Sequence, residues 1–144
     1  MRLKQLKLQP DVIFHHDLRL MVFRPRGVLS ERRIRALVKM LDDAETRAAK
    51  PFNRFTDFSQ LFAVDLEIEA ILSVSLHRQT TYATRAPVKS AYYVTTEAVG
   101  RVAKIHSLVM ESSYLSVKVF ETIGKAARWL GVKKEALLID PTGS

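Results

Sequence analysis

The stretch that decides the fold begins with Ser90-Ala91-Tyr92-Tyr93-Val94-Thr95-Thr96, a run of β-branched and aromatic residues that predicts a strand. The apolar spacing over residues 97–110 predicts an amphipathic helix, and Leu115-Ser116-Val117-Lys118-Val119-Phe120-Glu121 predicts a second strand. A second helix is predicted over residues 122–130, and Gly131 fits its C-terminal cap. Because strands that alternate with helices form a parallel sheet with crossover helices, this stretch predicts an α/β fold.

The preceding half of the chain extends the same pattern. Residues 12–16 and 18–23 are rich in strand-forming side chains and predict a hairpin, which ends at about Gly27. Ser30 is a good N-cap for a helix to about residue 48, whose apolar stripe runs i, i+3, i+4, i+7. A strand is predicted to end at Asp57, and a turn near Asp65 is predicted to lead into a helix that reaches about residue 82.

Length and composition favour an ordinary globular protein. The chain has 144 residues, so we expect one domain over residues 1–144, with a core at about 11–132 and a short tail at 133–144. No apolar run approaches the ~20 residues that span a bilayer, and residues 1–7 lack the apolar region of a secretory signal. The absence of cysteine excludes disulfides and thiolate chemistry, and we expect a cytoplasmic protein.

Positive charge is concentrated near the N-terminus. The formal charge is +8, and residues 1–50 hold 12 Lys and Arg against 6 Asp and Glu, whereas residues 51–144 hold 11 against 9. Such a surface either serves solubility or attracts an anionic partner such as a membrane surface. Nucleic acid is disfavoured because the aromatic residues lie in apolar runs and not among the basic ones. The candidate anionic-partner patch comprises Arg24, Arg26, Arg32, Arg33 and Arg35.

No arrangement of residues predicts catalysis or a metal site. His15 and His16 are neighbours, and adjacent strand residues point to opposite faces, which disfavours a shared metal ion. His106 falls in the apolar stripe of its helix and is interpreted as a core histidine. Paired carboxylates can serve acid–base catalysis, but no nucleophile with an oriented base and no glycine-rich phosphate loop accompanies the acidic residues 57–69. We therefore expect neither an enzyme nor a bound cofactor.

Several short blocks resemble a known family. They are Asn53-Arg54-Phe55-Thr56-Asp57, Val88-Lys89-Ser90-Ala91, Val119-Phe120 and Ala127-Arg128-Trp129-Leu130-Gly131-Val132. Together they resemble the SpoIIAA-like (STAS/SEC14-like) family of small bacterial proteins, whose function is unassigned. The resemblance implies an α/β fold with a mixed, mostly parallel sheet of about five strands and about four helices. It also implies self-association, so a homodimer is expected.

The phosphorylation switch of STAS domains is altered here. Their motif Asp-Leu-Ser is similar to Asp57-Phe58-Ser59, and Asp65 matches the aspartate of the Asp-Ser-Ser-Gly-Leu motif. The phosphorylatable serine would fall at Glu67, and the glycine is missing. The resemblance therefore implies the fold without the switch.

Three functions remain open from the sequence. The first is a non-catalytic regulatory or protein-interaction module, the second a carrier or sensor of a small apolar or lipid-like ligand, and the third binding of nucleic acid or an anionic surface through the basic N-terminal third. The candidate residues for binding a partner or ligand are Arg54, Asp57, Ser59, Asp65, Glu67, His77 and Arg78.

Overall fold

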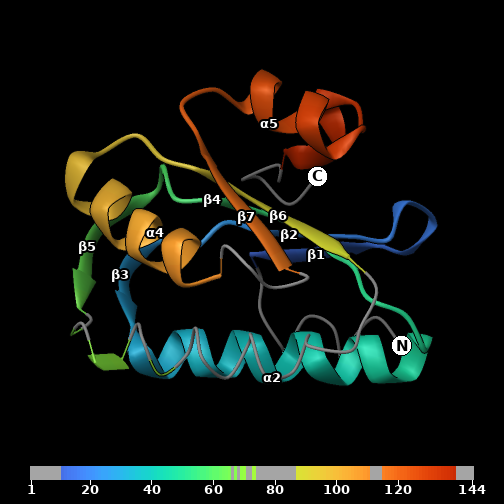
Figure 1. Ribbon diagram of the computed structural model, residues 1–144, viewed down its shortest axis with the longest axis horizontal. Coiled ribbons are helices and arrows are strands. Elements are labelled where there is room, and N and C mark those ends of the chain that lie inside the picture. Colours follow the sequence, from blue (N-terminus) through green and yellow to red (C-terminus); the bar gives the residue numbers. More distant parts are fainter. Residues whose placement is uncertain are drawn as a thin grey trace.

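A five-stranded sheet forms the centre of the protein (Figure 1). The computed structural model describes residues 11–65, 67, 69, 70, 73, 87–110 and 115–138. The strand order is β1-β2-β4-β6-β7, with β1 antiparallel to β2 and every other neighbouring pair parallel. The strands span Val12–His15 (β1), Leu20–Phe23 (β2), Asn53–Asp57 (β4), Val88–Tyr93 (β6) and Leu115–Phe120 (β7). The predicted hairpin and the mixed, mostly parallel α/β sheet are thus confirmed.

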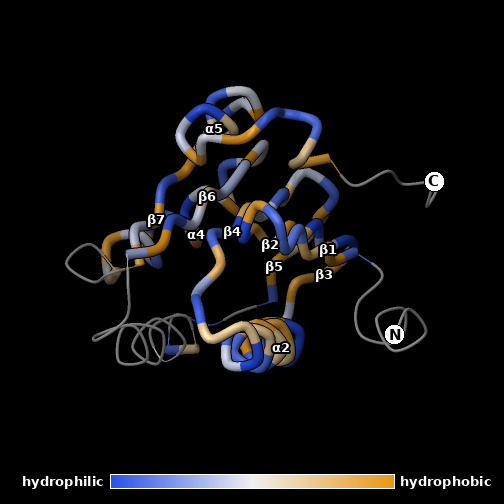
Figure 2. Tube along the Cα trace, turned by 90° about the vertical axis from the view of Figure 1, so that its right-hand side faces the viewer, coloured by the Kyte–Doolittle hydropathy of each residue, from blue (hydrophilic) through white to orange (hydrophobic). Residues whose placement is uncertain are grey.

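Helices cover both faces of this sheet. Helix α2 (Glu31–Ala48) lies on one side and α5 (Ile123–Leu130) on the other (Figure 2), and α4 (Glu97–Val109) connects β6 to β7. The predicted N-cap at Ser30 is confirmed, and Thr96 and Thr122 cap α4 and α5 in the same way: each hydroxyl accepts a hydrogen bond from the backbone N–H three residues later. Helix α5 ends at Gly131, whose φ of 74° is the left-handed conformation of a C-terminal cap.

The expected number of about four helices is not matched within the described residues, which contain three α-helices with assigned bounds. The helix predicted to end near residue 82 lies mostly outside the described residues. The described residues also contain two short 3-10 helices, His16–Leu18 (η1) and Lys134–Leu137 (η2).

A second, two-stranded parallel sheet corrects the sequence analysis. It pairs β3 (Gly27–Ser30) with β5 (Leu61–Asp65). The sequence predicted that extended structure ends at Gly27, but β3 begins there and runs directly into the N-cap of α2. Two apolar residues between a glycine and a capping serine are too short a run to show the period of a strand.

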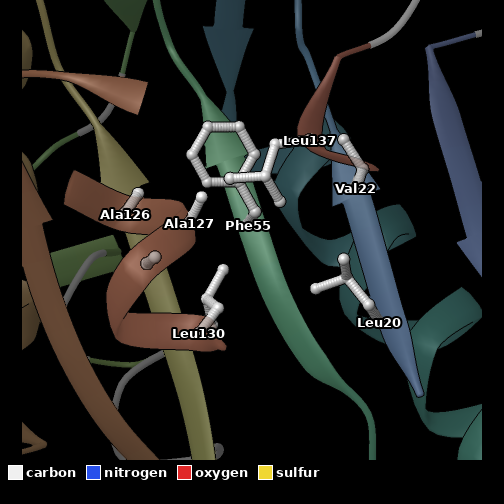
Figure 3. Packing of buried hydrophobic residues seen from close by; sticks show 8 residues of the cluster. Leu20, Val22, Phe55, Ala126, Ala127, Leu130 and Leu137 are labelled. Atoms are coloured by element: carbon white, nitrogen blue, oxygen red, sulfur yellow. The ribbon is translucent and has the colours of Figure 1, made fainter. Parts of the chain in front are cut away.

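The face of the main sheet toward α5 is a closed apolar core (Figure 3). Leu20 and Val22 from β2 and Phe55 from β4 pack against the three buried residues of α5, and Leu137 from η2 completes the cluster. The start of the tail therefore docks on the sheet through η2. The buried members of this core are Leu20, Val22, Phe55, Ala91, Ala126, Ala127, Leu130 and Leu137.

The opposite face, toward α2, is buried as well but less uniformly apolar. Met21 and Phe23 pack there against Leu41 and Phe52, as expected for strands that alternate between two covered faces. The central strands β4 and β6 instead place polar side chains on this face, where they line a pocket. Among the described residues no helix combines the length and apolarity needed to cross a membrane.

Candidate functional site

A pocket of about 130 Å³ lies between the main sheet and the helices α2 and α4. It is bounded on a further side by the β3–β5 sheet. Figure 1 shows α4, β3 and β5 at the left of the view and α2 below the main sheet. The lining residues are Met21, Phe23, Leu29, Ile34, Leu37, Val38, Leu41, Arg54, Thr56, Phe58, Val64, Ala70, Ser90, Tyr92, Val99, Val102, Ala103, His106 and Leu115.

The floor of this pocket is polar. Arg54 and Thr56 alternate with Phe55 along β4, so they share the face opposite the α5 core. On the neighbouring strand, Ser90 lies opposite Arg54 and Tyr92 lies opposite Thr56. Arg54, Thr56 and Ser90 are each at most 5% exposed, so the stripe is sheltered from bulk water.

A buried ion pair holds one end of the floor. A guanidinium nitrogen (Nη2) of Arg54 lies 3.2 Å from Oε2 of Glu45, and the two side chains are 4% and 1% exposed. The same carboxylate oxygen accepts a hydrogen bond of 2.7 Å from the backbone N–H of Phe52. Glu45 therefore ties the end of α2 to the start of β4 and offsets the charge of Arg54.

Three aromatic rings form one wall of the pocket. Phe58 meets Tyr92 edge to face with ring centroids 5.2 Å apart. Tyr92 stacks on His106 at 5.9 Å with an angle of 16° between the ring planes. His106, interpreted from sequence as a core histidine, thus lies half-buried in this ring stack at the pocket. All three of these residues line the pocket.

The remaining wall is aliphatic and comes from helix stripes that the sequence showed. Ile34, Leu37, Val38 and Leu41 of α2 share one side, and Val99, Val102 and Ala103 of α4 share another. Residues three and four apart on a helix form one face, so each stripe covers the sheet as a unit. The pocket therefore combines a polar floor with an apolar roof, an arrangement suited to binding a small molecule with an apolar body.

The structure separates the residues predicted to bind a partner or ligand. Arg54 lines the pocket, whereas Asp65 and Glu67 are exposed at and after the end of β5. Asp57 is buried, and its Oδ1 accepts a hydrogen bond of 2.8 Å from the backbone N–H of Ser59, which shapes the turn after β4. The other two predicted residues, His77 and Arg78, lie outside the described residues.

The basic patch is partly used within the fold. Arg33 lies 3.6 Å from the carboxylate of Asp11 and donates hydrogen bonds of 2.7 Å to the carbonyl oxygens of Arg26 and Val28. Arg35 pairs with Glu31 at 2.7 Å across one turn of α2. Arg26 and Arg32 are exposed, and Arg24 is half-buried. Arg33 therefore stabilises the segment that leads into α2, and its guanidinium is engaged within the fold.

Sequence reasoning missed the pocket as a unit. It chose Arg54 as a candidate binding residue and interpreted His106 as a core histidine, but it gave no role to Thr56 or Ser90, which complete the floor. The available signal was the polar side chains beside Phe55 and Ala91, in strands flanked by helices with strong apolar stripes. Within the described ranges, no group of three or more His, Asp or Glu side chains is placed to hold a metal ion.

Comparison with known proteins yields one described structural similarity. No family model matches the chain, and no curated protein matches it. The structure is similar to that of an uncharacterized protein of the DUF3478 family from Shewanella loihica PV-4, which has a SpoIIAA-like fold. The two share 17% sequence identity and a TM-score of 0.47 over 77% of this chain and 83% of that one.

Proposed function

We propose that this protein is a non-catalytic regulatory module that binds a small, mostly apolar molecule between its main sheet and the helices α2 and α4. The observation that carries the proposal is the pocket itself, with aliphatic and aromatic walls over a polar floor. Binding there would bridge the sheet and both helices, so occupancy would stabilise their relative packing. A ligand that binds only the folded state at 100 times its Kd adds about 2.7 kcal/mol to the free energy of unfolding.

The volume of the pocket limits the ligand. An engineered apolar cavity of about 150 Å³ binds benzene, whereas pockets for drug-sized molecules measure about 300–1,000 Å³. The pocket here, at about 130 Å³, is in the first class. The proposal therefore narrows the apolar ligand expected from sequence to a molecule whose buried part is about the size of one ring.

Native mass spectrometry of the gently purified protein tests the proposal. We expect a bound molecule of low mass that is lost on denaturation, and the same spectrum reports whether the protein forms the homodimer we propose. Ala103→Leu places extra carbon atoms in the pocket from α4, where Ala103 is 3% exposed. This variant is expected to lose the ligand. The matched control is Ala98→Leu, because Ala98 is exposed on the same helix and should leave binding intact.

Overpacking could unfold the Ala103 variant, so a second variant from another wall is required. Val38→Phe enters the pocket from α2 at a half-buried position. The proposal is wrong if both filled variants fold, by circular dichroism, and retain the same bound mass as the wild type. It is also wrong if the wild type carries no molecule and no single-ring compound raises its Tm.

A second candidate function, docking of a protein segment at β5, is favoured by Phe62. Its side chain is 81% exposed, the highest exposure of the large apolar side chains in the described residues. Exposed Asp65 and Glu67 follow it, so the chemistry suits a partner with an apolar anchor beside basic residues. Phe62→Ser should then abolish capture of that partner, whereas Leu108→Ser, at a 56% exposed site on α4, should not.

A further inference from the structure

The charge and hydrogen-bonding groups of the pocket floor indicate which ligands it accepts. Building on the proposed function, we infer that the pocket selects a neutral, planar, single-ring molecule that carries a hydrogen-bond acceptor, such as a carbonyl oxygen, directed at β4 and β6. The inference rests on the placement of the ion pair, the two floor hydroxyls and the ring stack. Each of these three features indicates one property of the ligand.

The acceptor follows from the donors on the floor. Arg54 carries a guanidinium group, which has N–H donors and no acceptor, and Thr56 and Ser90 carry hydroxyls that can donate. These three side chains lie on adjacent strands, Arg54 directly opposite Ser90 and Thr56 one position further along the same face of β4. An acceptor on the ligand therefore meets one hydroxyl from each of the two strands, and a purely apolar ligand would cover the hydroxyls of Thr56 and Ser90 without giving them a partner.

The neutral charge follows from Glu45. Its carboxylate lies 3.2 Å from Arg54 in an environment where both side chains are nearly fully buried. The pair already offsets its own charge, so an anionic ligand would add an uncompensated negative charge next to the carboxylate of Glu45. Burial of an unpaired charge is strongly unfavourable, and the floor therefore disfavours carboxylates although it contains an arginine.

The planar ring follows from the walls. Phe58, Tyr92 and His106 form a row of contacting rings along one side of the pocket, and aliphatic residues of α2 and α4 line other sides. An aromatic body stacks on such a row and packs its other face against aliphatic side chains. The small volume then leaves space for one ring and a short substituent.

Three probes of similar shape test the inference: acetophenone, ethylbenzene and benzoate. Their affinities are measured by ligand-observed and protein-observed NMR titration at neutral pH. Acetophenone is expected to bind about fivefold more tightly than ethylbenzene, since one net hydrogen bond to a neutral hydroxyl contributes about that factor. Benzoate is expected to bind more weakly than either.

Substitutions of the hydroxyl residues on the floor identify which groups donate a hydrogen bond to the carbonyl oxygen of the probe. Thr56→Val and Ser90→Ala remove one hydroxyl each, and the double variant should lower the preference for acetophenone over ethylbenzene at least threefold. Ser116→Ala is the matched control, because Ser116 is exposed on β7 and lines no part of the pocket. It should leave the preference unchanged.

Each outcome decides the inference separately from the proposed function. Equal affinity for acetophenone and ethylbenzene overturns the acceptor claim but leaves an apolar binding pocket. Tightest binding of benzoate overturns the claim of neutrality. If none of the probes binds, the inference is wrong, while a mass lost on denaturation in the native spectrum would still support a bound ligand of another class.

Discussion

Replacing Arg54 with methionine tests whether the buried ion pair holds the helix α2 to the sheet. Methionine keeps an unbranched apolar side chain but removes the guanidinium that lies 3.2 Å from Glu45. The variant leaves the carboxylate of Glu45, 1% exposed, without this counter-charge. Removing one partner of a buried pair costs about 3–5 kcal/mol, a large part of the 5–15 kcal/mol that stabilises a typical domain.

The measurement is urea denaturation followed by fluorescence and by circular dichroism. The chain contains one tryptophan, Trp129, whose ring lies 5.6 Å from Phe120, so its fluorescence reports a local environment on α5. Agreement of the two signals supports a two-state analysis. We expect Arg54→Met to lower the free energy of unfolding by about 3–5 kcal/mol.

Three control variants separate the effect of the charge from that of the packing. Glu45→Gln keeps an oxygen that can accept the hydrogen bond from Phe52 but removes the carboxylate charge that lies 3.2 Å from Arg54. The double variant Glu45→Gln/Arg54→Met buries no charge from this pair, so it should cost less than the sum of the single variants. Arg35→Met removes a pair with Glu31 whose side chains are 50% and 48% exposed, and it should cost at most about 0.5 kcal/mol. A loss below about 1 kcal/mol for Arg54→Met, or strict additivity in the double variant, would refute the reasoning.

Three further variants test the α5 side of the sheet by the same denaturation assay. Leu137→Ala, at a side chain 1% exposed in the core of Figure 3, should cost about 2–5 kcal/mol, and a loss under about 1 kcal/mol would show that η2 does not dock. Thr122→Ala removes the hydroxyl that accepts from the N–H of Lys125 and should cost about 1 kcal/mol, most of which Thr122→Ser should recover. Gly131→Ala should cost about 1–2 kcal/mol through its φ of 74° alone, because a Cβ there meets no atom within 4 Å; Gly131→Asn should cost less, and equal losses would contradict the backbone explanation.

Periodicity explains why the sequence predicted most of the main fold. Helix α2 carries both a capping serine and an apolar stripe, and each marks a boundary or a face without reference to the rest of the chain. The same holds for α5, which lies between Thr122 and Gly131. Strand β3 was missed because it has four residues and pairs with β5, which lies more than 30 positions away in the sequence. Such a strand is stabilised by pairing with a distant segment, and no local sequence pattern marks it.

The pocket required information that the sequence alone does not contain. A polar residue in a strand is ordinarily read as solvent-exposed, yet Arg54, Thr56 and Ser90 are all buried because β4 and β6 are central strands covered on both faces. Glu45 likewise lies on the buried side of its helix, α2. No short-range sequence signal pairs it with Arg54, which lies nine residues away. The candidate residue Arg54 was therefore found, but its surroundings could be assigned only from the packed structure.

The measurement that tests the central claim most directly is a methyl-selective nuclear Overhauser spectrum of the protein with bound acetophenone. The ring protons of the probe should show contacts to the methyl groups of Thr56, Ala103 and Leu37, which belong to the floor and to the two helical walls. That set of contacts would place the ligand between the main sheet and the helices α2 and α4. Contacts confined to exposed methyl groups such as those of Leu108 and Val119, or none to any lining residue, would contradict the account.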